Sequence, residues 1–121
     1  MPYHYKQGAI PVEPIVVCSR MSFCLGNLVK YVCRAPYKGN ELEDLKKALW
    51  YIDHINFNDL DEEVKQLQKD KVLCEVLSYG PAILKNLLLN VCKHDIQNLI
   101  RLALSKRINE LLVTENDEQR N

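Results

Sequence analysis

An amphipathic helix is predicted at residues 22–34, SFCLGNLVKYVCR. Ser22 can cap its first turn, and its apolar side chains recur at helical spacing. The apolar positions are Leu25, Leu28, Val29 and Val32. The opposite face holds Asn27, Lys30 and Arg34, which share one side because they are three and four residues apart. The segment therefore has one face to bury and one polar face.

Further helices are expected on both sides of this segment. A short helix opens near Glu13-Pro14, because proline suits the first helical turn. After a loop at residues 36–40, Asn40 is expected to cap a third helix, with Glu43 placed as in a capping box. Apolar residues between positions 42 and 55 give this helix one apolar stripe.

The second half of the chain has the same helical periodicity. A helix is expected from a cap at Asp59 to about Ser78, and another at residues 82–92, with apolar side chains nearly all round. Asp95 is expected to cap a last helix, and residues 114–121 to form a frayed, flexible tail. The sequence predicts an all-α fold, a compact bundle of about five to six helices with an irregular N-terminal arm.

Length and charge limit the possible functions. The 121 residues indicate a single domain, and sixteen basic residues balance sixteen acidic ones. This balance argues against a general duplex-DNA binder, which usually has a basic excess. The charge is uneven, however: residues 1–40 contain five basic residues and one acidic residue, whereas residues 41–70 contain nine acidic and four basic ones. One end of the chain could therefore attract a small anion.

The five cysteines are odd in number, and no pair has C-x-x-C spacing. Reduced and mostly buried thiols in a cytoplasmic protein are therefore expected, rather than a zinc ribbon or a disulfide framework. The N-terminus has no apolar signal-peptide core, and no stretch approaches the roughly 20 apolar residues of a membrane span. We expect a soluble protein that does not enter the membrane.

The polar face of residues 22–34 is the best candidate for a binding site. Lys30 and Arg34, with the Asn27 amide and with Lys38 in the following loop, could grip a phosphate group. The alternative is an ordinary solvated face. Gly26, in the middle of the same helix, marks the close approach of either a neighbouring helix or a ligand.

The helix that follows offers acidic and aromatic candidates. Glu41, Glu43 and Asp44 suit the helix dipole, but they could also pair with the preceding cations or hold Mg²⁺ beside a phosphate. Trp50 and Tyr51 could stack on a base or pack in the core. No P-loop, dinucleotide-binding glycine motif or hydrolase signature accompanies them.

Taken in order, several of these residues form one connected pattern. It consists of His4-Tyr5-x-x-Gly8, Phe23-Cys24-Leu25-Gly26-Asn27-x-x-Lys30-Tyr31-x-x-Arg34-Ala35, Lys38 and Glu43-Asp44-Leu45-Lys46-Lys47-Ala48-x-Trp50-Tyr51. The pattern resembles the SaV-like phage family of unknown function, often labelled phage nucleotide kinase. The resemblance covers residues 3–56. Residues 57–113 lie outside it as additional C-terminal helices.

The resemblance implies a bacteriophage nucleotide-binding protein in the cytoplasm of an infected bacterium, and a candidate deoxynucleoside monophosphate kinase without a P-loop. The nucleotide-binding residues that it implies are His4, Tyr5, Asn27, Lys30, Tyr31, Arg34, Lys38 and Lys46. Glu43 and Asp44 would hold Mg²⁺ if the protein is catalytic. The family often opens with His-Pro-x-His-Tyr, and Met1 replaces the first histidine here, so a two-histidine role is not expected.

Three functions remain open from the sequence. The first is the kinase. The second is a non-catalytic sponge that sequesters a nucleotide, such as a host immune signal, as an anti-defence protein. The third is an accessory protein that binds a host protein through its leucine-rich C-terminal helices. We also expect a homo-oligomer assembled partly through residues 81–113, because a helix that is apolar all round needs more cover than one small chain provides.

Overall fold

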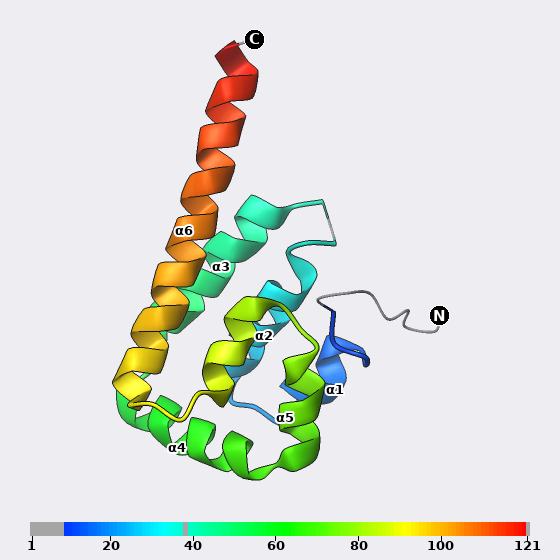
Figure 1. The fold of residues 1–121 in the computed structure, drawn as a ribbon, viewed down its shortest axis with the longest axis vertical. Coiled ribbons are helices and arrows are strands. Elements are labelled where there is room, and N and C mark those ends of the chain that lie inside the picture. Colours follow the sequence, from blue (N-terminus) through cyan, green and yellow to red (C-terminus); the bar gives the residue numbers. More distant parts are fainter. Residues whose placement is uncertain (1–8, 38, 121) are drawn as a thin grey trace.

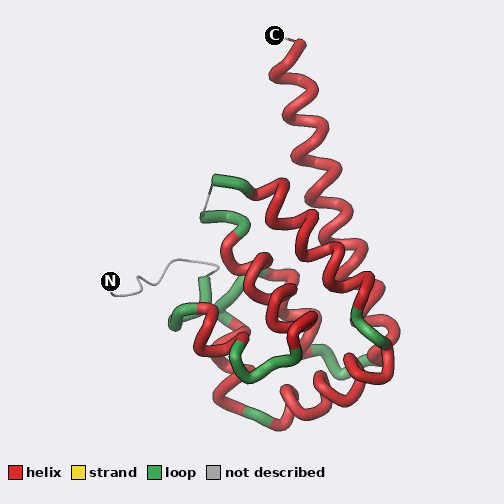
Figure 2. Tube along the Cα trace, turned by 180° about the vertical axis from the view of Figure 1, so that it is seen from behind, coloured by secondary structure: helices red, strands yellow, loops and turns green. Residues whose placement is uncertain are grey.

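The computed structural model describes residues 9–37 and 39–120, and within these ranges the fold is all-α, as predicted. Its seven helices are close to the five or six expected. They are α1 (Pro14–Cys18), α2 (Phe23–Arg34), α3 (Glu41–His54), α4 (Phe57–Lys69), α5 (Lys71–Ser78), the 3-10 helix η1 (Ala82–Leu88) and α6 (Lys93–Arg120). Short loops join them, and the described ranges contain no strand (Figure 2).

The arrangement centres on three long helices. α2 packs against α3, and α3 packs against α6 on its other side (Figure 1). α4, α5 and η1 close one end of the bundle, whereas the C-terminal part of α6 projects past α3 at the other end. The core lies between these helices and includes fully buried side chains from α2, α3, α5 and α6. Examples are Leu28, Ile52, Leu77 and Ile100.

The helix caps agree only partly with the sequence prediction. Ser22 caps α2 as expected, because its Oγ accepts a hydrogen bond from the backbone N–H of Leu25 at 3.4 Å. The capping box predicted at Asn40 is wrong: its side chain makes no capping hydrogen bond, and its backbone (φ −129°, ψ 48°) is not in the extended conformation of a usual cap. Three acidic residues in the first turn of α3 interact favourably with the helix dipole instead.

The helix expected from Asp59 to Ser78 is in fact two helices. α4 begins three residues earlier than predicted, with Asn56 in place of Asp59 as its cap, since Asn56 Oδ1 accepts from the N–H of Asn58 at 2.9 Å. The break between α4 and α5 falls at Asp70. The backbone of Asp70 is extended, and its Oδ1 accepts a hydrogen bond from the N–H of Leu73 at 3.0 Å. Apolar periodicity runs through this position, so it gave no sign of the break.

The prediction of an α-helix at residues 82–92 is also wrong. The segment forms the shorter 3-10 helix η1, which buries Leu84 and Leu87 against its own chain. Gln68 ends it, because its amide donates to the carbonyl oxygens of Leu87 and Leu89 at 3.0 and 2.9 Å. α6 then begins at Lys93, so that Asp95 lies in its first turn instead of capping it. The tail expected to be frayed is helical as far as Arg120.

Gly26 lies where α1 and α2 pack together. A Cβ atom at this position would lie 3.0 Å from the backbone oxygen of Cys18, which is tighter than ordinary contact. Of the two sequence interpretations, close helix packing is therefore the one that the structure supports.

All five cysteines are free thiols. Within the described residues, no helix combines the length and apolar character that crossing a membrane requires.

Candidate functional site

Two lysines from different helices meet over one tyrosine ring. On α2, Lys30 places its Nζ atom 4.5 Å from the ring centroid of Tyr31. On α3, Lys47 places its Nζ atom 5.3 Å from the same centroid. Both distances are within the range of a cation–π interaction. The packing of α2 against α3 thus brings two like charges near one aromatic ring, which attracts each of them.

The Tyr31 ring belongs to a larger aromatic cluster of Phe23, Tyr31, Trp50, Tyr51 and His54. Tyr31 stacks on Tyr51 with centroids 6.0 Å apart and an interplanar angle of 13°. Phe23 and Trp50 meet Tyr51 edge-on at 5.8 and 5.1 Å, and Trp50 stacks on His54 at 3.8 Å. Phe23 is 73% exposed and Trp50 54% exposed, so the cluster presents aromatic surface to solvent.

Arg34 is held beside the cluster by a buried carboxylate. Its Nε lies 3.2 Å from Oδ2 of Asp44, and the Asp44 side chain is only 2% exposed. Both of these atoms are shielded from solvent, whereas the Arg34 side chain as a whole is 41% exposed. The outer part of the guanidinium therefore faces solvent, in an orientation that Asp44 fixes from behind. The guanidinium carbon Cζ of Arg34 lies 6.0 Å from the ring centroid of Tyr31, so Arg34 belongs to the same surface.

The structure brings some of the predicted site residues together and separates others. Lys30, Tyr31 and Arg34 form one surface, as described above. The Asn27 amide is used within α2, where it donates to the carbonyl oxygen of Phe23 at 2.8 Å. Lys46 pairs with Glu43 at 3.7 Å. The predicted residues His4, Tyr5 and Lys38 lie outside the described ranges.

The acidic turn of α3 is not arranged as a metal site. Glu43 is 63% exposed and pairs with Lys46, whereas Asp44 is buried against Arg34. Among the described residues there is no group of three or more His, Cys, Asp and Glu side chains that could hold a metal ion. Mg²⁺ binding by this pair therefore stays a prediction from the resemblance. Of the sequence interpretations, pairing of an acidic residue with a preceding cation is the one that the geometry shows.

Sequence reasoning missed Lys47 as a site residue and left Trp50 and Tyr51 undecided between stacking and core packing. Trp50 is too exposed to belong to the core. Tyr51 packs at the edge of the core, where it joins α3 to α2. The missing information was the register of the two helices, which decides whether Lys46 or Lys47 reaches Tyr31. The sequence shows only that both lysines belong to the same helix.

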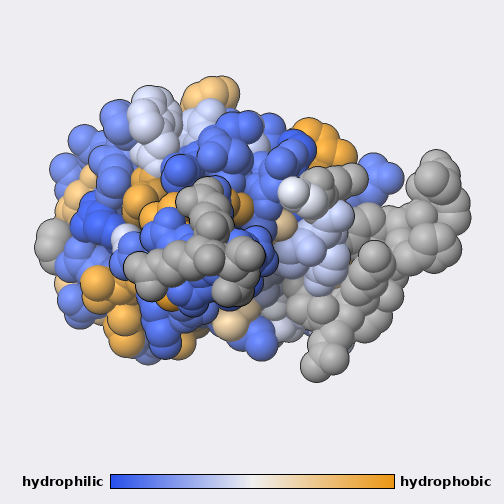
Figure 3. Space-filling model, turned by 90° about the horizontal axis from the view of Figure 1, so that it is seen from above, coloured by the Kyte–Doolittle hydropathy of each residue, from blue (hydrophilic) through white to orange (hydrophobic). Residues whose placement is uncertain are grey.

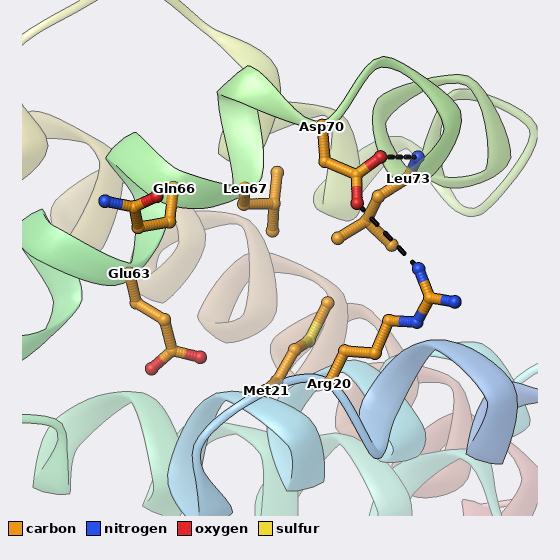
Figure 4. A pocket seen from close by; sticks show the side chains of 7 residues that line it. All are labelled: Arg20, Met21, Glu63, Gln66, Leu67, Asp70 and Leu73. Carbon is orange, nitrogen blue, oxygen red and sulfur yellow. Dashed lines mark hydrogen bonds and ion pairs between the residues drawn. The ribbon is translucent and has the colours of Figure 1, made fainter.

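A pocket of about 190 Å³ lies elsewhere, between the turn before α2 and the α4–α5 corner (Figure 4). Its polar side chains already serve the fold. Glu63 accepts a hydrogen bond from the backbone N–H of Ser22 at 2.8 Å, and Asp70 caps α5 while lying 3.9 Å from Arg20. We therefore place the candidate site on the α2–α3 surface. Seen from above, apolar patches are separate areas of a mostly hydrophilic surface (Figure 3).

One family model matches the chain. It describes a protein of unknown function (DUF3310), and the match covers residues 1–53. The matched stretch includes α1, α2 and all but the last residue of α3, and hence both lysines, Arg34 and Asp44. No curated protein and no solved structure matches the chain significantly.

Proposed function

We propose that the protein binds a nucleotide on the α2–α3 surface. The observation that carries this proposal is the convergence of Lys30 and Lys47, from two helices, on the Tyr31 ring. Two ammonium groups near one ring repel each other, and this repulsion falls when an anion binds near both of them. Phosphate is the anion that lysine and arginine side chains commonly bind in proteins.

The aromatic cluster supports a nucleotide over a simple phosphate. Bases stack on aromatic side chains, and such stacking contributes about 1–3 kcal/mol per base. Trp50 exposes more than half of its surface within the cluster that includes Tyr31. We expect the base to stack there while the phosphate lies near Lys30, Lys47 and Arg34. Among the described residues, the only ion pair that these three cations make is that of Arg34 with Asp44, so the local charge suits an anion although the chain is neutral.

The resemblance to the SaV-like phage family supports the same proposal, because it covers residues 3–56 and thus the whole surface. It also favours a second candidate function, phosphoryl transfer to a deoxynucleoside monophosphate. Such transfer depends mainly on positioning and charge neutralisation, so it does not require a P-loop. The burial of Asp44 against Arg34 favours capture of the nucleotide without chemistry, as in a sponge acting in an infected bacterium.

A thermal-shift screen tests the proposal. The full chain is heated with mono-, tri-, cyclic and dinucleotides, and with inorganic phosphate and nucleosides as controls. We expect at least one nucleotide to raise the melting temperature more than either control, because only a nucleotide engages both the cations and the rings. If every nucleotide leaves the melting temperature unchanged at millimolar concentration, the proposal is wrong.

Product analysis of any hit separates the kinase from the sponge. A kinase converts a deoxynucleoside monophosphate to its diphosphate with ATP and Mg²⁺, and loses this activity in Glu43→Gln or Asp44→Asn. Binding without product, at protein concentrations that would reveal slow turnover, supports the sponge. Asp44→Asn needs a circular dichroism control, because the substitution also breaks the buried pair with Arg34.

The homo-oligomer expected through residues 81–113 also remains a proposal. Leu84 and Leu87 in η1 are buried within the chain, so they are not available to a partner. Support comes from α6, where Leu102 is 66% exposed and Val113 is 59% exposed. Binding of a host protein by the same helix is the alternative.

A further inference from the structure

The outer face of α6 presents apolar side chains that do not pack in the core of the chain. The inner face of this 28-residue helix buries Ile100, Leu104 and Ile108. The opposite face presents Leu102 and Val113, which are eleven residues, or about three turns, apart. Residues 102, 106, 109 and 113 follow the four–three–four spacing of a helix-pairing face.

This face is open to solvent between its ends. A shallow surface depression there is lined by residues between Leu102 and Thr114, all from α6. In the ribbon view the C-terminal part of the helix stands clear of the bundle (Figure 1). The lining comes from α6 alone, so none of the other described elements covers this face, and its two exposed apolar side chains are separated by polar ones.

We propose that a second copy of this chain docks on this face, with the two α6 helices antiparallel about a two-fold axis near residues 107 and 108. Leu102 then lies against Val113 of the partner subunit, and by symmetry Val113 lies against Leu102 of the partner subunit. The two apolar contacts are about 16 Å apart along the helix, one on each side of the axis. The face is thus complementary to itself in the antiparallel direction.

The charges on one edge of this face favour the same arrangement. Lys106 and Glu110 are four residues apart, so they lie on one edge of the helix. The two-fold axis brings Lys106 next to Glu110 of the partner subunit, and the reverse pair forms across the axis. A parallel pair in register would instead place Lys106 beside a second Lys106. Within its own chain, Glu110 pairs with Arg107 at 3.2 Å, whereas Lys106 is exposed and makes no ion pair with a described residue.

Light scattering on the full chain, together with a set of variants, tests this inference, which does not depend on nucleotide binding. The parent is expected to have twice the mass of one 14.1 kDa chain. Leu102→Glu combined with Val113→Glu should shift it to the mass of one chain, because both sites are exposed and the substitutions leave the core intact. Ile15→Glu on α1, which is also 66% exposed, is the matched control and should keep the parent's mass.

A charge swap tests the direction of packing. Lys106→Glu should weaken the dimer, because it places two carboxylates side by side in each of the two symmetry-related pairs, and adding Glu110→Lys should restore it. Circular dichroism of each variant confirms that the chain stays folded. A parent that is monomeric at tens of micromolar overturns the inference and leaves the face to a different partner. A dimer that survives Leu102→Glu with Val113→Glu, or a swap that restores nothing, overturns it as well.

Discussion

In α4 the exposed surface is charged, whereas on the α2–α3 surface it is aromatic and cationic. Asp61 and Glu62 of α4 pair with Lys65 at 3.2 and 3.9 Å within one helix, opposite a fully apolar buried face. On the α2–α3 surface, Phe23 and Trp50 lie open to solvent. Helix stability and solubility explain the first arrangement. They do not explain the second, because exposed large aromatic side chains gain little from folding.

A substitution in the buried face of α4 should have the largest effect, which is a loss of stability. Leu60 is 1% exposed, so Leu60→Ala leaves a cavity and should lower the free energy of unfolding by about 2–5 kcal/mol. Urea denaturation followed by circular dichroism measures this loss. Nucleotide affinity of the folded fraction should not change. A loss below about 1 kcal/mol would mean that the bundle does not depend on this contact.

The cationic side of the α2–α3 surface should show the next largest effect. Arg34→Ala should weaken nucleotide binding by about 1.5–3 kcal/mol, the range for a hydrogen bond to a charged group. Arg101→Ala is the matched control, because Arg101 is 40% exposed and also pairs with a carboxylate, that of Asp53 at 2.6 Å. Calorimetry should find the parent's affinity in the control. Equal losses in both variants would remove Arg34 from the site.

The aromatic side should separate binding from stability. Trp50→Ala should weaken nucleotide binding by about 1–3 kcal/mol through the lost stacking surface. Its free energy of unfolding should change less than that of Leu60→Ala, because Trp50 is 54% exposed. Phe57→Ala is the control at an aromatic residue of α4 that is 39% exposed. If Trp50→Ala destabilises the fold as much as Leu60→Ala does and leaves binding intact, the cluster is structural.

The thiols beneath α1 and α2 should show the smallest effect. Burial raises the pKa of Cys18 from 9.0 to about 11 and that of Cys33 to about 12. The neutral thiols therefore stabilise the fold fully below pH 9, and this contribution is lost as the pH rises towards 11–12, because the unfolded chain releases these protons first. At pH 8 a disulfide reagent should modify exposed Cys92 before half-buried Cys18 or buried Cys33. Rapid modification of Cys33 in the folded protein would contradict this.

The sequence predicts the parts of the molecule that depend on local spacing. The apolar positions of residues 22–34, the Ser22 cap and the start of α1 all follow from it. The break at Asp70 does not, because apolar periodicity passes through it. The end of η1 is hydrogen-bonded by Gln68, which is distant in sequence. Neither the break at Asp70 nor the short form of η1 can therefore be predicted without knowing the tertiary contacts.

The candidate site, too, can be predicted only in part from the sequence. Lys30, Tyr31 and Arg34 share one helix face, so their spacing predicts that they act together. The partners that α3 contributes depend on the register between two helices, which no local pattern encodes. The family resemblance implied Lys46 as a site residue, whereas the geometry brings Lys47 to the Tyr31 ring.

These neighbouring lysines allow the most direct test of the α2–α3 site. Calorimetric titration with the four deoxynucleoside monophosphates should be performed on the parent, Lys47→Ala and Lys46→Ala. Both variants remove one exposed positive charge from α3; Lys46 pairs with Glu43 at 3.7 Å, whereas Lys47 lies at the Tyr31 ring. We expect Lys47→Ala to weaken binding by about 0.5–1 kcal/mol more than Lys46→Ala, the scale of an exposed cation–π contact. Equal affinities in all three proteins, or a greater loss in Lys46→Ala, would contradict the proposed site.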